Sequence, residues 1–100
     1  MDPLPILAEL VSIPSVNPMG RAVTGPIYLE AKLSDHLVGF FQRLGVDHVR
    51  IEVAPQRANV IACVRGRGDG PCILLDAHQD TVPVDGMTID PFRPVVEGDR

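Results

Sequence analysis

The residues with the clearest chemical potential lie in the stretch LLDAHQDTVP, residues 74–83. An apolar run leads directly into Asp76, His78 and Asp80, so one imidazole stands between two carboxylates. Imidazole is the commonest metal ligand, and its second ring nitrogen usually donates a hydrogen bond to a group that holds the ring. Asp80, two residues beyond His78, is the natural partner for that contact. The pattern therefore predicts a metal-ligating His78 that is oriented by Asp80.

The spacing of His78 and Asp80 is weak evidence by itself, because a chain with three His and nine Asp residues can contain such a pair by chance. The alternative is a surface loop in which Asp80 only caps a turn. Position favours the functional interpretation, since binding sites in open α/β sheets form beyond the carboxyl ends of strands. For Asp76 we favour a structural role, in which its carboxylate accepts hydrogen bonds from loop N–H groups.

The other candidate ligands fit structural roles better. His48 falls on the polar face of an alternating stretch, and His36 lies near the edge of a helical apolar stripe. Cys63 and Cys72 have no partners at zinc-finger spacing, so we expect reduced, buried thiols. A catalytic zinc needs about three protein ligands. If His78 binds a metal, the remaining ligands must come from sequence outside these residues.

Length and composition limit the classes to which the chain can belong. One hundred residues, 45% of them hydrophobic and 22% charged, are typical of one small globular domain. The formal net charge of −4 argues against a nucleic-acid-binding protein. No apolar run approaches the ~20 residues that span a bilayer, and the N-terminus lacks the features of a signal peptide. We therefore expect a cytoplasmic protein that binds neither nucleic acid nor membrane.

Hydrophobic periodicity indicates the elements that must position these residues. Helical spacing predicts a first helix over 3–13 and a second from Pro26 onward, with Gly45 as its stop. Alternation of apolar and polar residues predicts a strand over 46–53, and a more continuous apolar run predicts another over 58–64. The positioning elements are therefore expected to be two helices followed by strands.

A third strand is predicted over CILLDA, residues 72–77, whose unbroken Ile-Leu-Leu run suggests burial on both faces. The link before it, residues 65–71, is short enough for a hairpin, and a possible short strand follows at 94–97. Helices beside strands favour an α/β fold with two helices packed on a mixed sheet, with residues 1–100 as one unit.

The longer stretch LLDAHQDTVPVDG, followed by DPFRPVVEGDR, resembles the two-zinc amidohydrolases that include acetylornithine deacetylase, succinyl-diaminopimelate desuccinylase, aminoacylase and glutamate carboxypeptidases. The family's first site motif is a strand, then His-x-Asp, then a Val-Pro step, which corresponds here to residues 78–83. LVSIPSVNP at 10–18 is similar to the family's opening helix and loop, and ANVIA at 58–62 to an earlier strand. The resemblance covers nearly the whole chain in the right order.

The resemblance implies the N-terminal part of a zinc-peptidase-like catalytic domain. His78 would ligate one of two zinc ions, for which cobalt or manganese could substitute, and Asp80 would be the catalytic aspartate that holds His78. The family's next motif, Gly-Arg-Gly-x-x-Asp, would begin within a few residues of VEGDR. The bridging Asp, the general base and the dimerisation domain would then lie beyond Arg100. We therefore expect an N-terminal fragment of a longer, homodimeric enzyme.

The function that the resemblance implies for the complete enzyme is metal-dependent hydrolysis of an amide bond in small N-acyl amino acids, of the deacetylase or desuccinylase type. Alternatives are a metallo-carboxypeptidase or dipeptidase of the same family, a truncated non-catalytic domain, or a small independent interaction module. Nothing in these residues selects between N-acyl amino acids and short peptides as substrates. The 100-residue chain alone is expected to show no amidase activity and to hold no tight zinc site.

Overall fold

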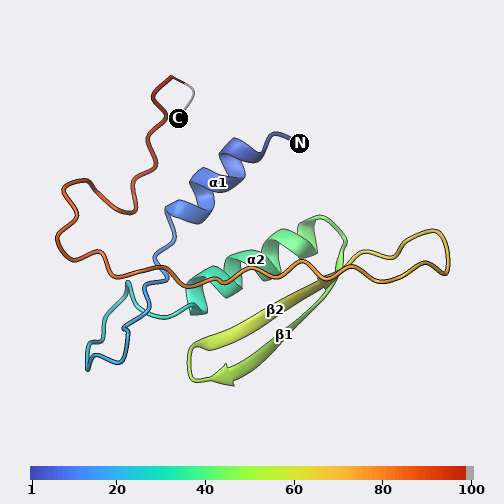
Figure 1. Cartoon of the computed structure of the whole chain (residues 1–100), viewed down its shortest axis with the longest axis horizontal. Helices are drawn as coiled ribbons and strands as arrows, with labels where there is room; N and C mark the ends of the chain where they lie inside the picture. The colour runs from blue at the N-terminus through green and yellow to red at the C-terminus, as the bar shows by residue number, and fades with distance from the viewer. Residues whose placement is uncertain (99–100) are drawn as a thin grey trace.

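The computed structural model describes residues 1–98 as two helices and one β-hairpin, joined to a long extended segment (Figure 1). The elements are α1 (Pro3–Val11), α2 (Ala31–Arg43), β1 (Asp47–Ala54) and β2 (Arg57–Cys63). Residues 99 and 100, the end of the stretch DPFRPVVEGDR, lie outside the described residues. The predicted α/β class, with two helices and a sheet, is confirmed.

The start of α1 is set by its local sequence. The Asp2 carboxylate accepts a hydrogen bond from a first-turn N–H at 3.0 Å, and Pro3 occupies the first turn, where a missing N–H does no harm. The helix ends at Val11, two residues earlier than predicted. No residue of α1 is buried, and one of its contacts with α2 places the Glu9 carboxylate 3.7 Å from Nε2 of His36. α1 is therefore a lightly packed element.

α2 begins at Ala31, later than the predicted first turn at Pro26. The preceding residues pair instead with Val16, and Leu29 has a φ of 67°, in the left-handed region that a right-handed helix excludes. The predicted stop is confirmed, because the helix ends just before Gly45, whose φ is 65°. Tertiary pairing thus decides where this helix starts, and local sequence decides where it stops.

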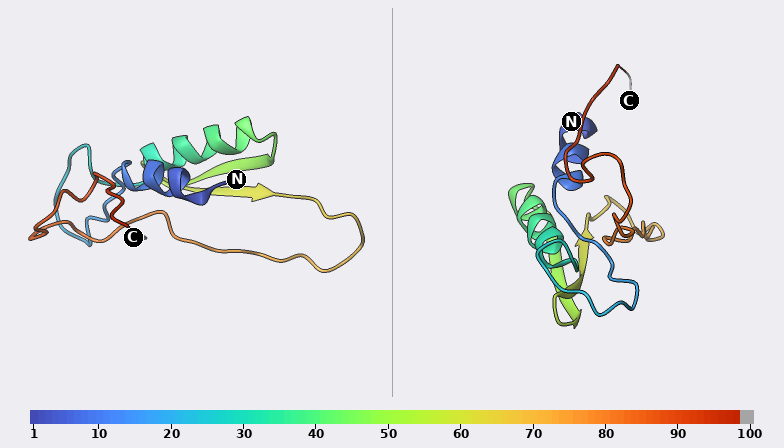
Figure 2. Two further views of the ribbon diagram at one scale, coloured as in Figure 1. Left: turned by 90° about the horizontal axis from the view of Figure 1, so that it is seen from above. Right: turned by 90° about the vertical axis from the view of Figure 1, so that its left-hand side faces the viewer.

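β1 and β2 form an antiparallel hairpin in which Val49 pairs with Ile61. Pro55 and Gln56 make the turn, with Gln56 at a φ of 61°. Both strands agree with their predicted ranges to within one residue at each end. α2 packs against both strands and lies along the hairpin in both views of Figure 2.

The third strand predicted over 72–77 is not formed, and neither is the short strand predicted over 94–97. The apolar run Ile73–Leu75 is 81% to 90% exposed, although the prediction placed it in the core. Residues 64–78 bend at 67–69 and make no backbone–backbone hydrogen bond to another described residue. A strand requires a neighbour for its N–H and C=O groups, and residues 1–98 provide none here. The sheet is two-stranded and antiparallel rather than mixed.

Parallel pairing occurs instead as isolated bridges from Val16 to Tyr28 and to Thr81. The Val16 N–H donates to the Ile27 carbonyl at 2.8 Å, so three segments that are distant in sequence lie side by side. Val16 is 1% exposed, and it is the largest fully buried side chain in the described part of the protein. The tightest packing therefore surrounds the loop that follows α1.

Within residues 1–98, no helix has the length and the apolar character needed to cross a membrane.

Candidate functional site

The loop after α1 is bonded directly to the loop that carries the predicted site residues. The Asn17 N–H donates to the Thr81 carbonyl at 2.8 Å, and the Thr81 N–H donates to the Ser15 carbonyl at 3.0 Å. The Ser15 hydroxyl, in a residue that is 1% exposed, donates to the carbonyl of Gln79 at 2.8 Å, across 64 positions of sequence. These bonds fix the backbone of residues 79–81, beside His78.

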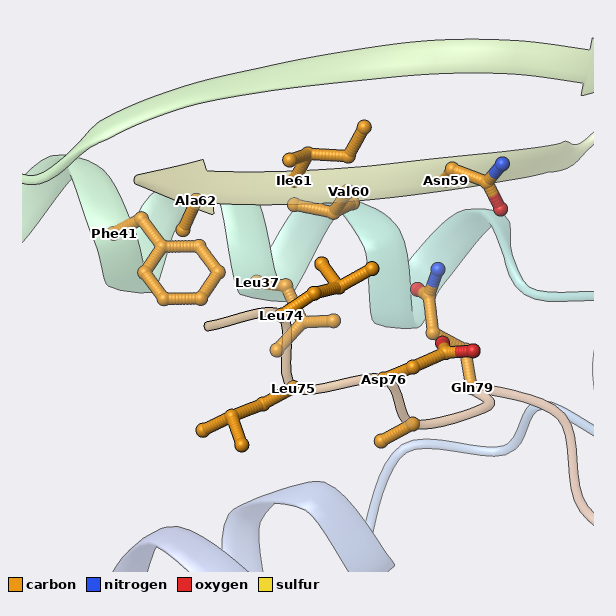
Figure 3. A pocket seen from close by; sticks show the side chains of 11 residues that line it. Leu37, Phe41, Asn59, Val60, Ile61, Ala62, Leu74, Leu75, Asp76 and Gln79 are labelled. Carbon is orange, nitrogen blue, oxygen red and sulfur yellow. The ribbon is translucent and has the colours of Figure 1, made fainter. Parts of the chain in front are cut away.

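The Gln79 side chain anchors the same loop to both the helix and the hairpin. Its Oε1 accepts a hydrogen bond from the Ser34 hydroxyl of α2 at 2.9 Å, and its Nε2 donates to the Ala58 carbonyl of β2 at 2.8 Å. Ser34 and Ala58 are 0% and 6% exposed. Figure 3 shows Gln79 reaching from the extended segment toward these elements. One amide therefore joins three parts of the chain.

The structural role expected for Asp76 belongs to Gln79. Asp76 is exposed and makes no hydrogen bond to the rest of residues 1–98, so the expectation that it braces the loop is wrong. An amide both donates and accepts without carrying charge, which suits a buried junction better than a carboxylate does. The sequence signal for this role was Gln79 itself, a polar residue between His78 and Asp80.

The expectation of buried thiols is also wrong, because Cys63 and Cys72 are both free and exposed. They flank the loop that leads from β2 to the unformed third strand. Without that strand, nothing among the described residues covers them.

The structure brings His78 and Asp80 into contact. Nδ1 of His78 lies 2.7 Å from the backbone oxygen of Asp80 and 3.2 Å from its Oδ1. Both oxygens are acceptors, so Nδ1 carries the proton of the neutral ring and Nε2 carries the lone pair. The His78 side chain is 85% exposed. This is the tautomer in which an imidazole binds a metal through Nε2 while a second group holds Nδ1.

Asn17 holds the other oxygen of the Asp80 carboxylate. Its Nδ2 donates to Oδ2 at 2.5 Å, while its Oδ1 accepts from the Met19 N–H at 2.8 Å, which orients the amide. The Asn17 hydrogen bond is the main cause that holds the pKa of Asp80 below its ordinary value. Partial burial opposes this shift, and the nearby His78 and Arg57 add smaller lowering effects on the pKa. Asp80 is therefore an ionised carboxylate at neutral pH.

A partly buried ion pair between Glu30 and Arg57 lies beside these groups. Nε and Nη2 of Arg57 donate to the two Glu30 carboxylate oxygens at 3.0 Å and 2.5 Å, a bidentate arrangement. The Glu30 side chain is 7% exposed and that of Arg57 36%. Glu30 is the residue that precedes α2, but it makes no side-chain cap because its carboxylate is committed to Arg57. The hydrogen bond to Glu30 is the main cause that raises the pKa of Arg57.

These groups border a common cavity of about 500 Å³. Its charged and polar lining includes Glu30, Arg57, Asp76, His78, Gln79 and Asp80. Within residues 1–98, no group of three or more His, Cys, Asp and Glu side chains is arranged to hold a metal ion. His78 fits one of the roughly three protein ligands of a catalytic zinc, with Asp80 as the group that supports it.

The other two histidines do not line this cavity. Nδ1 of His48 lies 2.7 Å from the Val46 carbonyl, and its ring packs near Phe41 with the ring centroids 6.3 Å apart. His36 faces Glu9 between the helices. The contacts of both side chains therefore lie outside the cavity.

No protein-family model, no curated protein and no solved structure matches this chain. The resemblance seen in its motifs stays a prediction, and a functional proposal has to be argued from the geometry of the site.

Proposed function

We propose that this chain is the part of a metal-dependent amidohydrolase domain that presents the metal ligand His78 and the orienting carboxylate Asp80. The complete enzyme would hydrolyse an amide bond in small N-acyl amino acids. The observation that supports this is the way Asp80 meets both neighbours: its backbone oxygen lies 2.7 Å from Nδ1 of His78 and its carboxylate 3.2 Å from the same nitrogen, while Asn17 holds the carboxylate. Nε2 of the exposed ring is left to bind a metal. An aspartate that only capped a turn would need neither the amide donor nor the imidazole.

The chain's own residues have separate tasks in this proposal. The backbone oxygen of Asp80 holds Nδ1–H of His78, and its carboxylate lies beside the same nitrogen. Asn17 holds the carboxylate in the orientation that this contact requires, and Gln79 fixes the intervening backbone against α2 and β2. Zinc, cobalt or manganese bound through Nε2 would polarise the scissile carbonyl and lower the pKa of a bound water to about 7.

The size of the cavity supports a small substrate. Ligand pockets for small molecules typically enclose about 300 to 1,000 Å³, and the cavity beside His78 encloses about 500 Å³. Its lining does not separate an N-acyl amino acid from a dipeptide or from the substrate of a metallo-carboxypeptidase. The substrate class is therefore proposed as a small amide, with the deacetylase or desuccinylase type first.

The test uses the complete enzyme and a panel of N-acetyl and N-succinyl amino acids. We expect His78→Ala to reduce amine release to background, and Asp80→Asn to reduce metal affinity or turnover by about 10- to 100-fold, as for other groups that orient a metal ligand. The matched control is His48→Ala, which removes an imidazole outside the cavity and should leave turnover unchanged. Full turnover in both site variants would contradict the proposal.

For the 100-residue chain on its own, we propose a non-catalytic state. A catalytic zinc takes about three protein ligands, and His78 would supply one. We expect zinc to be lost on dialysis, with no amide hydrolysis by the chain alone. Stoichiometric zinc after exhaustive dialysis, measured by elemental analysis, would overturn this second proposal without affecting the first.

A further inference from the structure

Arg57 is the one cationic residue, among those described, in the lining of the cavity beside His78. It is the first residue of β2, and its backbone position is fixed by pairing with Ala54 of β1. The other charged residues of the lining all carry carboxylates: Glu30, Asp76 and Asp80. An anionic ligand that enters this cavity therefore has Arg57 as its protein cation.

The guanidinium of Arg57 keeps donors in reserve after its pairing with Glu30. Nε and Nη2 donate to the two oxygens of that carboxylate at 3.0 Å and 2.5 Å. A guanidinium presents more N–H groups, in a rigid planar fork, than one carboxylate can use. Within residues 1–98 the side chain of Arg57 makes no further hydrogen bond. The edge formed by Nη1 and the second N–H of Nη2 can therefore hold another carboxylate in a bidentate manner.

Glu30 holds this edge in place before any ligand arrives. The Glu30 side chain is largely inside the protein, at 7% exposed, whereas that of Arg57 reaches the surface, at 36%. A guanidinium that is already fixed loses less conformational entropy on binding than a mobile side chain does. The hydrogen bond to Glu30 is the main cause that raises the pKa of Arg57, and the charge of Asp80 adds a smaller raising effect. The guanidinium is therefore within electrostatic reach of the carboxylate beside His78.

We propose that Arg57 binds the free carboxylate of the substrate through Nη1 and Nη2 and so selects amides that lie next to a carboxylate. The inference rests on the proposed function, because in an N-acyl amino acid only the amide nitrogen and Cα separate the carboxylate from the scissile carbonyl. A dipeptide and the substrate of a carboxypeptidase have the same arrangement. Substrates whose carboxylate is blocked as an amide, and internal peptide bonds, are therefore expected to be poor.

The test compares an N-acetyl amino acid with its C-terminal carboxamide as substrates of the complete enzyme. We expect kcat/KM to favour the free carboxylate by about 10- to 100-fold, mainly through KM, which is the range of a hydrogen bond between charged groups. Glu30→Gln leaves Arg57 in place and should keep this preference. The double variant Glu30→Gln with Arg57→Ala buries no charge and should lose it. The matched control, Arg65→Ala, removes an arginine outside the cavity and should keep it.

Calorimetry on the metal-free complete enzyme adds a readout that does not depend on turnover, since bound metal ions would also attract a carboxylate. The parent enzyme should bind the N-acetyl amino acid about tenfold more tightly than the carboxamide, and the double variant should bind both alike. A preference that survives the double variant overturns the inference.

A parent enzyme that binds both ligands alike in calorimetry also overturns the inference, and this is the result expected if another carboxylate of the complete enzyme occupies the free edge of Arg57. A parent enzyme that hydrolyses no N-acyl amino acid would instead overturn the proposed function, and this inference with it.

Discussion

Residues 73–75 and 79–81 are near neighbours in sequence but lie in opposite environments. The first group is apolar, 81% to 90% exposed and without backbone–backbone hydrogen bonds to other described residues. The second is polar and is tied to the loop after α1, to α2 and to β2. The best-buried residues of the described chain, Ser15, Val16 and Ser34, belong to that polar junction.

The difference teaches that hydrophobicity alone does not decide which segment becomes ordered by packing. Apolar burial is non-directional and requires enough surface to cover the side chains, and residues 1–98 provide too little around 73–75. A hydrogen-bonded junction requires only matching donors and acceptors at the right places. Since buried polar groups must be satisfied, the junction around Gln79 forms as a unit and positions His78 and Asp80.

The largest expected effect comes from removing the cation beside the junction. Arg57→Ala leaves the Glu30 carboxylate buried and unpaired, so we expect the free energy of unfolding to fall by about 3 kcal/mol, measured by urea denaturation at a concentration where the chain is monomeric. The double variant Glu30→Gln with Arg57→Ala should regain most of this loss, because it buries no charge. Arg65→Ala is the matched control, since its side chain is 88% exposed. Equal losses in Arg57→Ala and Arg65→Ala would show that the pair is unimportant.

A smaller effect is expected when residues 79–81 and residues 73–75 are compared by single substitutions. Gln79→Ala removes the partners of the Ser34 hydroxyl and the Ala58 carbonyl, so we expect a loss of about 2 kcal/mol in unfolding free energy. Leu75→Ala removes more apolar surface, but from a side chain that is 90% exposed; its loss should stay within about 0.5 kcal/mol. Urea denaturation of both variants under the same conditions provides the comparison. A larger loss in Leu75→Ala than in Gln79→Ala would reverse our ranking of the two regions.

The smallest effect depends on pH. The pKa of Asp80 is lowered in the folded state, so its ionised form stabilises the fold above the ordinary value of 3.8, and this contribution is lost as the pH falls through the folded value. Asn17→Asp keeps the acceptor for Met19 but replaces the amide donor with a second carboxylate oxygen. We expect a loss of about 1 kcal/mol at pH 7 that shrinks as the pH falls below about 4.

The control for this pH dependence is Gln42→Glu, an amide-to-carboxylate substitution at an exposed position of α2 that does not line the cavity. Urea denaturation at pH 7 and pH 3.5 should show little pH-dependent difference between that variant and the parent chain. If Asn17→Asp is equally destabilised at both pH values, its effect comes from altered packing and not from the Asp80 carboxylate.

Features that depend on near neighbours could be predicted from the sequence. Asp2 and Pro3 mark the start of α1, Gly45 marks the end of α2, and alternation of side chains locates β1 and β2 to within one residue. The contact between His78 and Asp80 spans two positions, so composition and spacing also indicate it. In each case the interacting groups are close along the chain, and few conformations compete.

Features that depend on distant segments could not be predicted in the same way. α2 begins late because the backbone before it pairs with Val16, and Asp80 is held by Asn17 from 63 positions away. The 72–77 segment has the composition of a core strand but remains exposed, since its state depends on a neighbour and not on its own residues. Pattern reasoning also chose Asp76 as the brace, where an amide at Gln79 acts instead.

The sequence by itself determined the two helical segments, the hairpin and the imidazole–carboxylate pair, because periodicity, caps and short spacings act locally. The tertiary structure alone decided that Asn17, Gln79 and the Glu30–Arg57 pair surround His78, and that the Ile-Leu-Leu run before it is uncovered. The physical reason is that a hydrogen bond or a buried surface between distant segments exists only when both partners have been placed.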